Sequence, residues 1–206
     1  MRRTILLLFI GALSFNVFAQ SNSLTTGFGI LNPKVRVQYE AGFGDMHSAG
    51  VNLGYYLVNW TGPRLEGFYR IYFGGDHEKG MFMQASAGAG MFSYALDDDA
   101  ETTFDYVDPV TGVTTNYDIY NSGGTWVTSG GGIAFGGKMT SRGGFVFEST
   151  MGYQIWTAPP SNYSSNYDDY WANSAAGAVD AVETLGYYLI GPGFPLQFQI
   201  KLGFNF

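Results

Sequence analysis

The chain has 206 residues, a length that fits one domain. It has no cysteine, so neither a disulfide framework nor a cysteine-ligated metal site can form. Seventeen acidic residues outnumber ten lysines and arginines, and this argues against nucleic acid as a partner because its binders carry a basic face. Thirty glycines and 17% aromatic residues disfavour long helices and suit strands joined by tight turns.

The first twenty residues have the pattern of a secretory signal peptide. Arg2 and Arg3 precede the apolar run Ile5–Leu13, and the segment closes on Val17-Phe18-Ala19. Polar residues follow the apolar run too soon for a transmembrane helix, which needs about twenty apolar residues. We therefore expect a signal peptide over residues 1–19, cleaved on export, and one β-barrel domain over residues 20–206.

Segments of about ten residues then alternate apolar and polar side chains, as in strands of a barrel with one apolar and one polar face. In the second segment, for example, Val35 and Val37 share one face while Lys34 and Arg36 share the other. The expected strands are Leu24–Leu31, Lys34–Phe43, Ser48–Val58, Arg64–Phe73, Met81–Phe92, Thr125–Lys138, Phe145–Trp156 and Leu196–Phe206.

Two of these strands are less regular than the rest. Leu24–Leu31 is short, and the glycines at Gly130–Gly132, Gly136 and Gly137 loosen Thr125–Lys138, where a bulge is expected. Loop lengths support the count, because outer-membrane barrels have short periplasmic turns and longer outer loops. Short turns are expected at Gly44–His47, Gly74–Lys79 and Met139–Arg142, and long connections at Ser93–Gly124 and Thr157–Phe194.

The segment Tyr170–Gly191, in the second long connection, is ambiguous. Ala175, Val179 and Val182 recur at helical spacing, whereas Leu185–Ile190 could form a ninth strand. We expect a short helix. The predicted fold is therefore all-β: an eight-stranded antiparallel up-and-down transmembrane β-barrel with two long outer loops and a short helix in the last loop.

Two groups of charged residues stand out. The acids between Met81 and Phe135 have no lysine or arginine among them and belong to the first long loop. A second group lies on the polar faces of the strands and would point into the barrel, where charges must be paired. This inward set is Lys34, Arg36, Glu40, Arg64, Glu66, Arg70, Lys138, Glu148 and Lys201.

An eight-stranded barrel has an interior just wide enough to be filled by side chains. We therefore expect the inward charges to form a structural ion-pair network that closes the lumen. Two alternatives remain open: a membrane pore for small solutes, and a soluble, lipocalin-like barrel that holds a ligand.

Residues that could carry chemistry are few. His47 and His77 both fall in short turns, far from outer-leaflet lipid, so we expect no histidine-dependent catalysis on lipid. Asp97-Asp98-Asp99 lacks the spacing of a calcium loop, and no lysine follows Gly130–Gly132 at phosphate-loop spacing. We expect no catalytic residue, no cofactor and no metal site.

Aromatic residues in the long loops stand among serine, asparagine, glycine and aspartate. Such mixtures recur in antibody paratopes, because aromatic rings give contact area at a low entropic cost. A surface partner is therefore one expectation, and an ordered polar cap is the other. The residues concerned are Tyr106, Tyr117, Tyr120, Tyr163, Tyr167, Tyr170 and Trp171.

Several short motifs, spread over nearly the whole mature chain, resemble those of a known family of proteins. They are Tyr39-Glu40, Leu53-Gly54-Tyr55-Tyr56, Arg70-Ile71-Tyr72-Phe73, Gly80-Met81-Phe82 and the closing Gly203-Phe204-Asn205-Phe206. On these residues the chain resembles small bacterial outer-membrane β-barrel proteins of unassigned function. The resemblance implies an outer-membrane location, contact with membrane lipid, and recognition of the terminal Phe206 by the barrel-assembly machinery. It implies no activity, so we expect a non-enzymatic, monomeric barrel with a structural or surface-interaction role.

Overall fold

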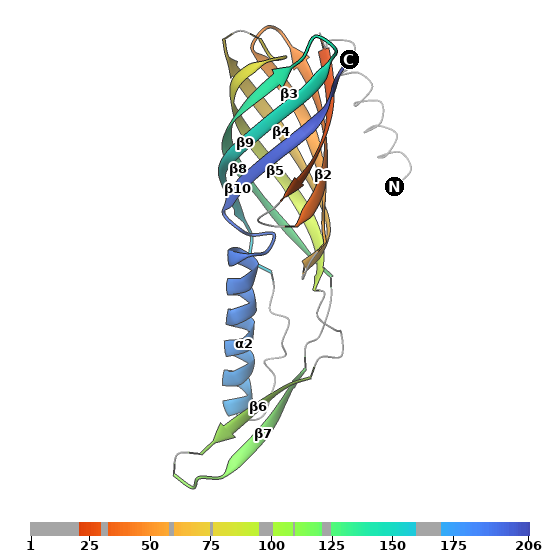
Figure 1. Ribbon diagram of the computed structural model, residues 1–206. Coiled ribbons are helices and arrows are strands. Elements are labelled where there is room, and N and C mark those ends of the chain that lie inside the picture. The colour runs from red at the N-terminus through yellow and green to blue at the C-terminus, as the bar shows by residue number, and fades with distance from the viewer. Residues whose placement is uncertain are drawn as a thin grey trace, which may run out of the picture.

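The computed structural model describes residues 21–29, 33–57, 60–74, 76–94, 101–108, 110–120, 125–159 and 170–206. The expected signal peptide lies outside these residues. Eight antiparallel strands close into a barrel, as the alternation predicts, in the order β1-β10-β9-β8-β5-β4-β3-β2 (Figure 1). The barrel strands are β1 (Ser21–Gly29), β2 (Lys34–Phe43), β3 (His47–Tyr56), β4 (Trp60–Phe73), β5 (Gly80–Tyr94), β8 (Thr125–Thr140), β9 (Phe145–Trp156) and β10 (Leu196–Asn205).

The strand bounds differ from the predicted ones at several ends. β1 begins three residues before Leu24 and ends at Gly29, and β3 ends at Tyr56. β4 begins at Trp60, four residues before Arg64. These differences arise because a strand ends where its backbone hydrogen bonds end. The hydrogen-bonded ladder can be longer or shorter than the segment in which apolar and polar side chains alternate.

The glycine-rich strand β8 contains no bulge within its pairing with β5, so that expectation is wrong. Its register with β5 runs without a break from Gly80↔Lys138 to Ser93↔Thr125. Two of these glycines instead make room for rings: a Cβ atom on Gly136 would lie 2.4 Å from Cζ of Phe82, and one on Gly130 would lie 2.8 Å from Cδ2 of Trp156.

Short turns join the strands at one end of the barrel, which we call the turn end. Gly44 (φ 64°) and Gly144 (φ 80°) adopt left-handed backbone conformations there, and glycine does so without a Cβ clash. The C-terminus lies at the same end, opposite α2 (Figure 1). The observed short turns at this end match the predicted loop asymmetry.

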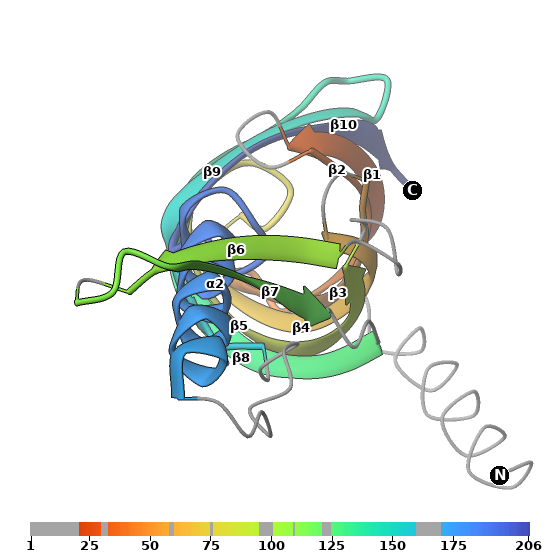
Figure 2. The same cartoon turned by 90° about the horizontal axis from the view of Figure 1, so that it is seen from below.

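The other end, the loop end, carries two extensions. The first long connection forms a hairpin of β6 (Glu101–Val107) and β7 (Thr114–Tyr120), which the sequence reading did not anticipate (Figures 1 and 2). The carboxylate of Asp108 accepts hydrogen bonds from the backbone N–H groups of Val110 and Thr111 at 2.7 and 3.0 Å, and these bonds lower the pKa of Asp108. This turn therefore organises the hairpin.

The second extension is helix α2 (Tyr170–Leu189), which confirms the predicted helix and excludes a ninth barrel strand at this position. At 20 residues it is longer than expected. Within the described residues, no helix combines the length and apolar character needed to cross a membrane.

The barrel wall has the reverse distribution of polar and apolar side chains to that of a water-soluble protein. Polar and charged side chains fill its interior, while large apolar side chains cover the outward faces of the strands. Leu65 and Phe204, for instance, are 56% and 62% exposed, whereas Arg70 is 0% exposed. The outward set is Leu24, Phe28, Val35, Val37, Val51, Leu53, Tyr55, Leu65, Tyr69, Phe73, Met81, Met83, Met91, Val127, Ile133, Phe135, Met139, Phe145, Phe147, Met151, Tyr153, Ile155, Leu196, Phe198, Ile200, Leu202 and Phe204.

Candidate functional site

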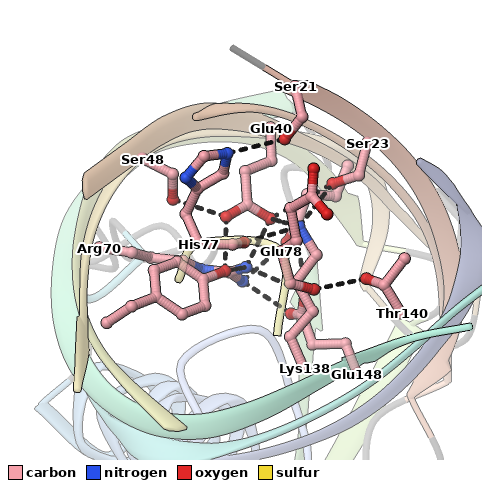
Figure 3. A network of polar contacts seen from close by, with 12 residues as sticks. Ser21, Ser23, Glu40, Ser48, Arg70, His77, Glu78, Lys138, Thr140 and Glu148 are labelled. Atoms are coloured by element: carbon pink, nitrogen blue, oxygen red, sulfur yellow. Dashed lines mark hydrogen bonds and ion pairs between the residues drawn. The ribbon is translucent and has the colours of Figure 1, made fainter. Parts of the chain in front are cut away.

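The middle of the barrel holds an ion-paired cluster, which we call the central network: Glu40, Arg70, Lys138, Glu148 and Lys201. Figure 3 labels the first four of these residues. The two guanidinium Nη atoms of Arg70 bind both Glu148 oxygens, at 2.9 and 2.6 Å. One of them also reaches Glu40, at 2.8 Å. Such charge-assisted, bidentate contacts are the strongest hydrogen bonds available to these side chains.

Both glutamates of the central network are fully engaged. Besides Arg70, Glu40 accepts hydrogen bonds from Ser48 (2.5 Å) and Tyr72 (2.7 Å), and it pairs with Lys138 at 3.2 Å. Glu148 pairs with Lys201 at 2.7 Å. Saturation of this kind is what makes a buried carboxylate tolerable, because unmet hydrogen bonds in the interior are costly.

Every strand of the barrel contributes to this network or to its immediate partners. The contributing side chains, one from each strand in chain order from β1 to β10, are Ser23, Glu40, Ser48, Arg70, Gln84, Lys138, Glu148 and Lys201. The contacts therefore cross the lumen instead of following its wall, as the view into the barrel shows (Figure 3).

Aromatic rings cover the guanidinium group of Arg70. Its central carbon lies 4.1 Å from the ring centre of Phe82 and 4.6 Å from that of Phe68. Both rings are buried, and cation–π attraction strengthens when water is excluded. Because Phe82 packs against Gly136 of β8, the position of Arg70 depends on a glycine that the network does not touch directly.

A second charged group, the loop-end cluster, consists of Lys34, Arg36, Arg64 and Glu66. Glu66 pairs with Arg64 at 2.8 Å and with Arg36 at 3.3 Å. Lys34 contacts the hydroxyl of Tyr56 at 3.1 Å, and no carboxylate among the described residues lies within ion-pair distance of it. This cluster thus combines three cations with one carboxylate.

Buried aromatic residues close the barrel above the loop-end cluster, and we call them the aromatic lid: Tyr56, Trp60, Phe92, Trp126 and Tyr187. Tyr187 comes from α2, so the helix is anchored in the mouth of the barrel. Its hydroxyl shares a hydrogen bond of 3.3 Å with Thr128, and burial raises the pKa of Tyr187 to about 12.

The connection from α2 to β10 is tied to the same end. Arg64 donates a hydrogen bond to the carbonyl oxygen of Pro192 at 3.3 Å, and Gln154 donates one to that of Phe194 at 2.6 Å. The guanidinium of Arg64 also stacks on Trp156, 3.5 Å from the ring centre. Arg64 therefore links the barrel wall, the lid and the outer loop.

His77 lies in the short turn between β4 and β5, as the sequence predicts, but its side chain is buried at the turn end of the barrel. It is 7% exposed and shares a hydrogen bond of 2.7 Å with Ser21 (Figure 3). It fits because Gly42, opposite its ring, has no side chain. Its Nδ1 atom has no hydrogen-bond partner in the described part of the chain, so the serine–histidine pair lacks the third group that would orient a catalytic base.

The other histidine, His47, is the first residue of β3 and hydrogen bonds through Nδ1 to the hydroxyl of Tyr69 at 2.9 Å, on the exposed side. The two histidines thus lie on different faces of the wall. They do not form a common site.

The structure places all nine residues expected to pair in the lumen inside the barrel, but it divides them between two clusters. It leaves Lys34 without a carboxylate partner among the described residues. Sequence reasoning missed Gln38, Ser48, Tyr72 and Gln84, which complete the central network. Their even spacing on the polar faces could have identified them. The terminal residue Phe206 exchanges two backbone hydrogen bonds with Asn22, at 2.8 and 2.9 Å.

Several loop residues singled out in the sequence lie outside the described residues: Asp97, Asp98, Asp99, Tyr163 and Tyr167. Within the described ranges, no group of three or more histidine, aspartate or glutamate side chains is arranged to hold a metal ion.

Comparison with known proteins found no matching family model and no matching curated protein. Among solved structures, the N-terminal β-barrel domain of Pseudomonas aeruginosa OprF is similar, with 12% sequence identity and a TM-score of 0.40. The alignment covers 90% of this chain and 96% of that one. A likeness of this size identifies no function.

Proposed function

We propose that this chain is an outer-membrane β-barrel whose lumen is closed by ion pairs and which has a structural or surface-interaction role without enzymatic activity. One observation carries the proposal: the wall is apolar outside and charged inside. Soluble monomers rarely expose contiguous apolar patches larger than a few hundred Å². A closed barrel with an apolar exterior is, by contrast, one of the two structures that satisfy all backbone hydrogen bonds in lipid.

The strand lengths support the same assignment. A tilted strand needs about 9–11 residues to cross the hydrocarbon core of a bilayer. The barrel strands range from 9 residues in β1 to 16 in β8. The closed sheet also supports a monomer, because closure removes the free strand edges through which sheets associate.

The filled lumen supports a structural role over a pore. The central network crosses the interior, and the aromatic lid and His77 lie on either side of it. A soluble ligand-holding cup is disfavoured because it would need the opposite arrangement, with a polar exterior. The hairpin β6–β7 and helix α2 extend from the loop end, where they would be available to a partner outside the cell (Figure 1).

Membrane fractionation tests the location. The full-length protein, expressed in a bacterium with two membranes, should sediment with the outer membrane and resist extraction by carbonate. On a gel, unboiled samples should migrate differently from boiled ones, because folded barrels resist detergent until heated. A protein that remained soluble with the periplasmic contents would overturn the proposal.

Planar-bilayer recording tests the closed lumen. The purified barrel should show no steady conductance, whereas the Arg70→Ala, Glu148→Ala double variant, if it folds, should conduct more readily. Steady channels in the wild-type protein would favour the pore instead. A small molecule co-purifying in the lumen would favour the cup.

A further inference from the structure

We propose that helix α2 presents an apolar stripe to the outer leaflet of the membrane, so that lipid contacts the helix as well as the barrel wall. The inference rests on the proposed function, because it needs the barrel to lie in a bilayer. The residues of this α2 stripe are Val182, Leu185 and Leu189, which are 68%, 56% and 57% exposed. An exposed apolar stripe of this kind needs a partner that is not water.

The opposite side of α2 is fixed to the barrel by three consecutive residues. Tyr187 is buried in the aromatic lid. Tyr188 donates a hydrogen bond of 3.0 Å from its hydroxyl to the carbonyl oxygen of Trp156, the last residue of β9. A Cβ atom on Gly186 would lie 3.3 Å from the ring of Trp60. These contacts hold the last turn of α2 in one orientation about its axis.

The α2 stripe lies on the side of the helix that faces away from these contacts. At about 3.6 residues per turn, its three residues lie about 160–220° around the axis from Tyr187. The charged residue Glu183 lies about 40° from Tyr187, on the fixed side. The helix stands over one side of the wall in both views (Figures 1 and 2). Since Tyr187 points into the mouth of the barrel, the stripe points outward, as the apolar side chains of the wall do.

The apolar exterior of the wall reaches the base of this helix. Ile155 faces outward on β9, is 66% exposed and directly precedes Trp156, which Tyr188 contacts. Tyr153 faces outward two residues earlier and pairs with Leu196, which is also exposed. Tyrosine is enriched where a membrane meets water. We therefore locate the outer edge of the hydrocarbon core near Tyr153, beside the C-terminal end of α2.

The length of the stripe fits the headgroup layer outside this edge. That layer is about 5–8 Å thick on each side of a bilayer. Leu185 and Leu189 are four residues apart, which is about 6 Å along a helix. Figure 1 shows the axis of α2 running along that of the barrel, with the C-terminal end nearest the wall. Leu189 should therefore lie deepest, Leu185 within the headgroup layer, and Val182 near its outer surface.

Lipid fits the stripe better than a second copy of the chain does. Lipid that covers the outward face of β9 would adjoin the helix without any further assembly. Three aliphatic side chains supply only a small part of the roughly 1,200 Å² that a stable protein interface buries. The closed ring also leaves no barrel strand edge through which a second copy could extend the contact.

Spin labels on single cysteines test the proposal, because the chain has no cysteine of its own. Val182→Cys, Leu185→Cys and Leu189→Cys replace exposed side chains, so the refolded variants should keep the gel shift of the folded barrel. In lipid vesicles, collisions of each label with oxygen, which concentrates in lipid, are compared with collisions with a water-soluble nickel chelate. Phe135→Cys, on the outward face of β8, is the lipid reference, and Val110→Cys, at the exposed turn of the hairpin, is the water reference.

The label at Leu189 should be the deepest of the three, and depth should fall by about 10 Å toward Val182, because a helix rises about 1.5 Å per residue. Labels at Leu185 and Leu189 that meet nickel as freely as the label at Val110, with Phe135 in lipid, would overturn the inference and leave the proposed function intact. A label at Phe135 that meets water would overturn both. Stripe labels shielded from both reagents, with spin coupling between chains, would assign the stripe to a second copy and overturn the inference.

Discussion

The two charged clusters inside the barrel differ in how their charges balance. The central network sets Arg70, Lys138 and Lys201 against Glu40 and Glu148, and each carboxylate oxygen has at least one donor. The loop-end cluster has a single carboxylate, Glu66. The carboxylates of the central network thus have all their oxygens hydrogen bonded. In the loop-end cluster, by contrast, the Nε atoms of Arg36 and Arg64 have no hydrogen-bond partner among the described residues. The comparison indicates that the ion pairs of the centre stabilise the barrel more than those of the loop end do.

Removal of Arg70 should have the largest effect on stability. Arg70→Met removes ion pairs to two carboxylates at once, Glu40 and Glu148, and loss of a buried ionic partner costs about 3–5 kcal/mol. Urea unfolding in lipid vesicles should show this decrease in the free energy of unfolding. Arg142→Met, on the exposed turn between β8 and β9, is the matched control and should change little. A loss under about 1 kcal/mol for Arg70→Met, below the cost expected of a broken buried pair, would contradict a stabilising centre.

The next largest effect should come from Gly136→Ala. The added Cβ atom would lie 2.4 Å from the Phe82 ring and 2.6 Å from the carbonyl oxygen of Ser149. Overpacking of this kind costs about 1–3 kcal/mol, and here it would also displace the ring that covers Arg70. Gly137→Ala faces outward, with only the sulfur of Met81 at 3.4 Å, and is the control in the same unfolding assay. Equal losses for the two variants would refute the packing explanation.

Arg64→Met should destabilise the protein less than Arg70→Met does. Arg64 pairs with one carboxylate only, Glu66, which keeps Arg36 as a partner. The expected loss is therefore about 1–3 kcal/mol, from unmet hydrogen bonds at Gln154 and Pro192. Amide hydrogen exchange should become faster in residues 190–195, which Arg64 tethers. If Arg64→Met proved as costly as Arg70→Met, the proposed difference between the two clusters would be wrong.

Tyr187→Phe should have the smallest effect, about 0.5–1.5 kcal/mol for one neutral hydrogen bond. The hydroxyl of Tyr187 also makes the free energy of unfolding depend on pH. Burial raises the pKa of Tyr187 from 10.0 to about 12, so the folded state retains a proton that the unfolded state loses. This contribution is complete below pH 10 and is lost as the pH rises toward 12. The free energy of unfolding of the wild type minus that of Tyr187→Phe, measured from pH 9 to 12, should decline across that window. A constant difference would show that Tyr187 is not buried in the lid.

Most of the barrel could be predicted from the sequence, because alternation with a period of two identifies both the strands and the face that each side chain occupies. Even the short β1 was predicted, with help from the loop lengths. The hairpin β6–β7 was missed because its strands have seven residues each and stand in a segment rich in acids. The turn at Asp108 was the available signal.

The division of the interior into two clusters could not be predicted. Alternation places Lys34 and Arg70 on the same face of the wall, but it does not give the stagger between strands that decides which charges meet. Lys201 and Gln38 are 163 positions apart and lie 2.6 Å from each other only because of that stagger. The burial of His77 was equally hidden, since it depends on the missing side chain of Gly42 on another strand.

The contribution of a side chain from every strand to the central network has a consequence for assembly. The network can be complete only when β1 and β10, the first and last strands, have met. Until then, Glu148 and Arg70 would border an open, wet groove, where ion pairs are weak. Contacts over such long sequence separations form slowly, because loop closure must precede them. Ring closure and expulsion of water from the lumen should therefore occur together as the last folding event, and an incomplete barrel would gain little of the stability of the finished one.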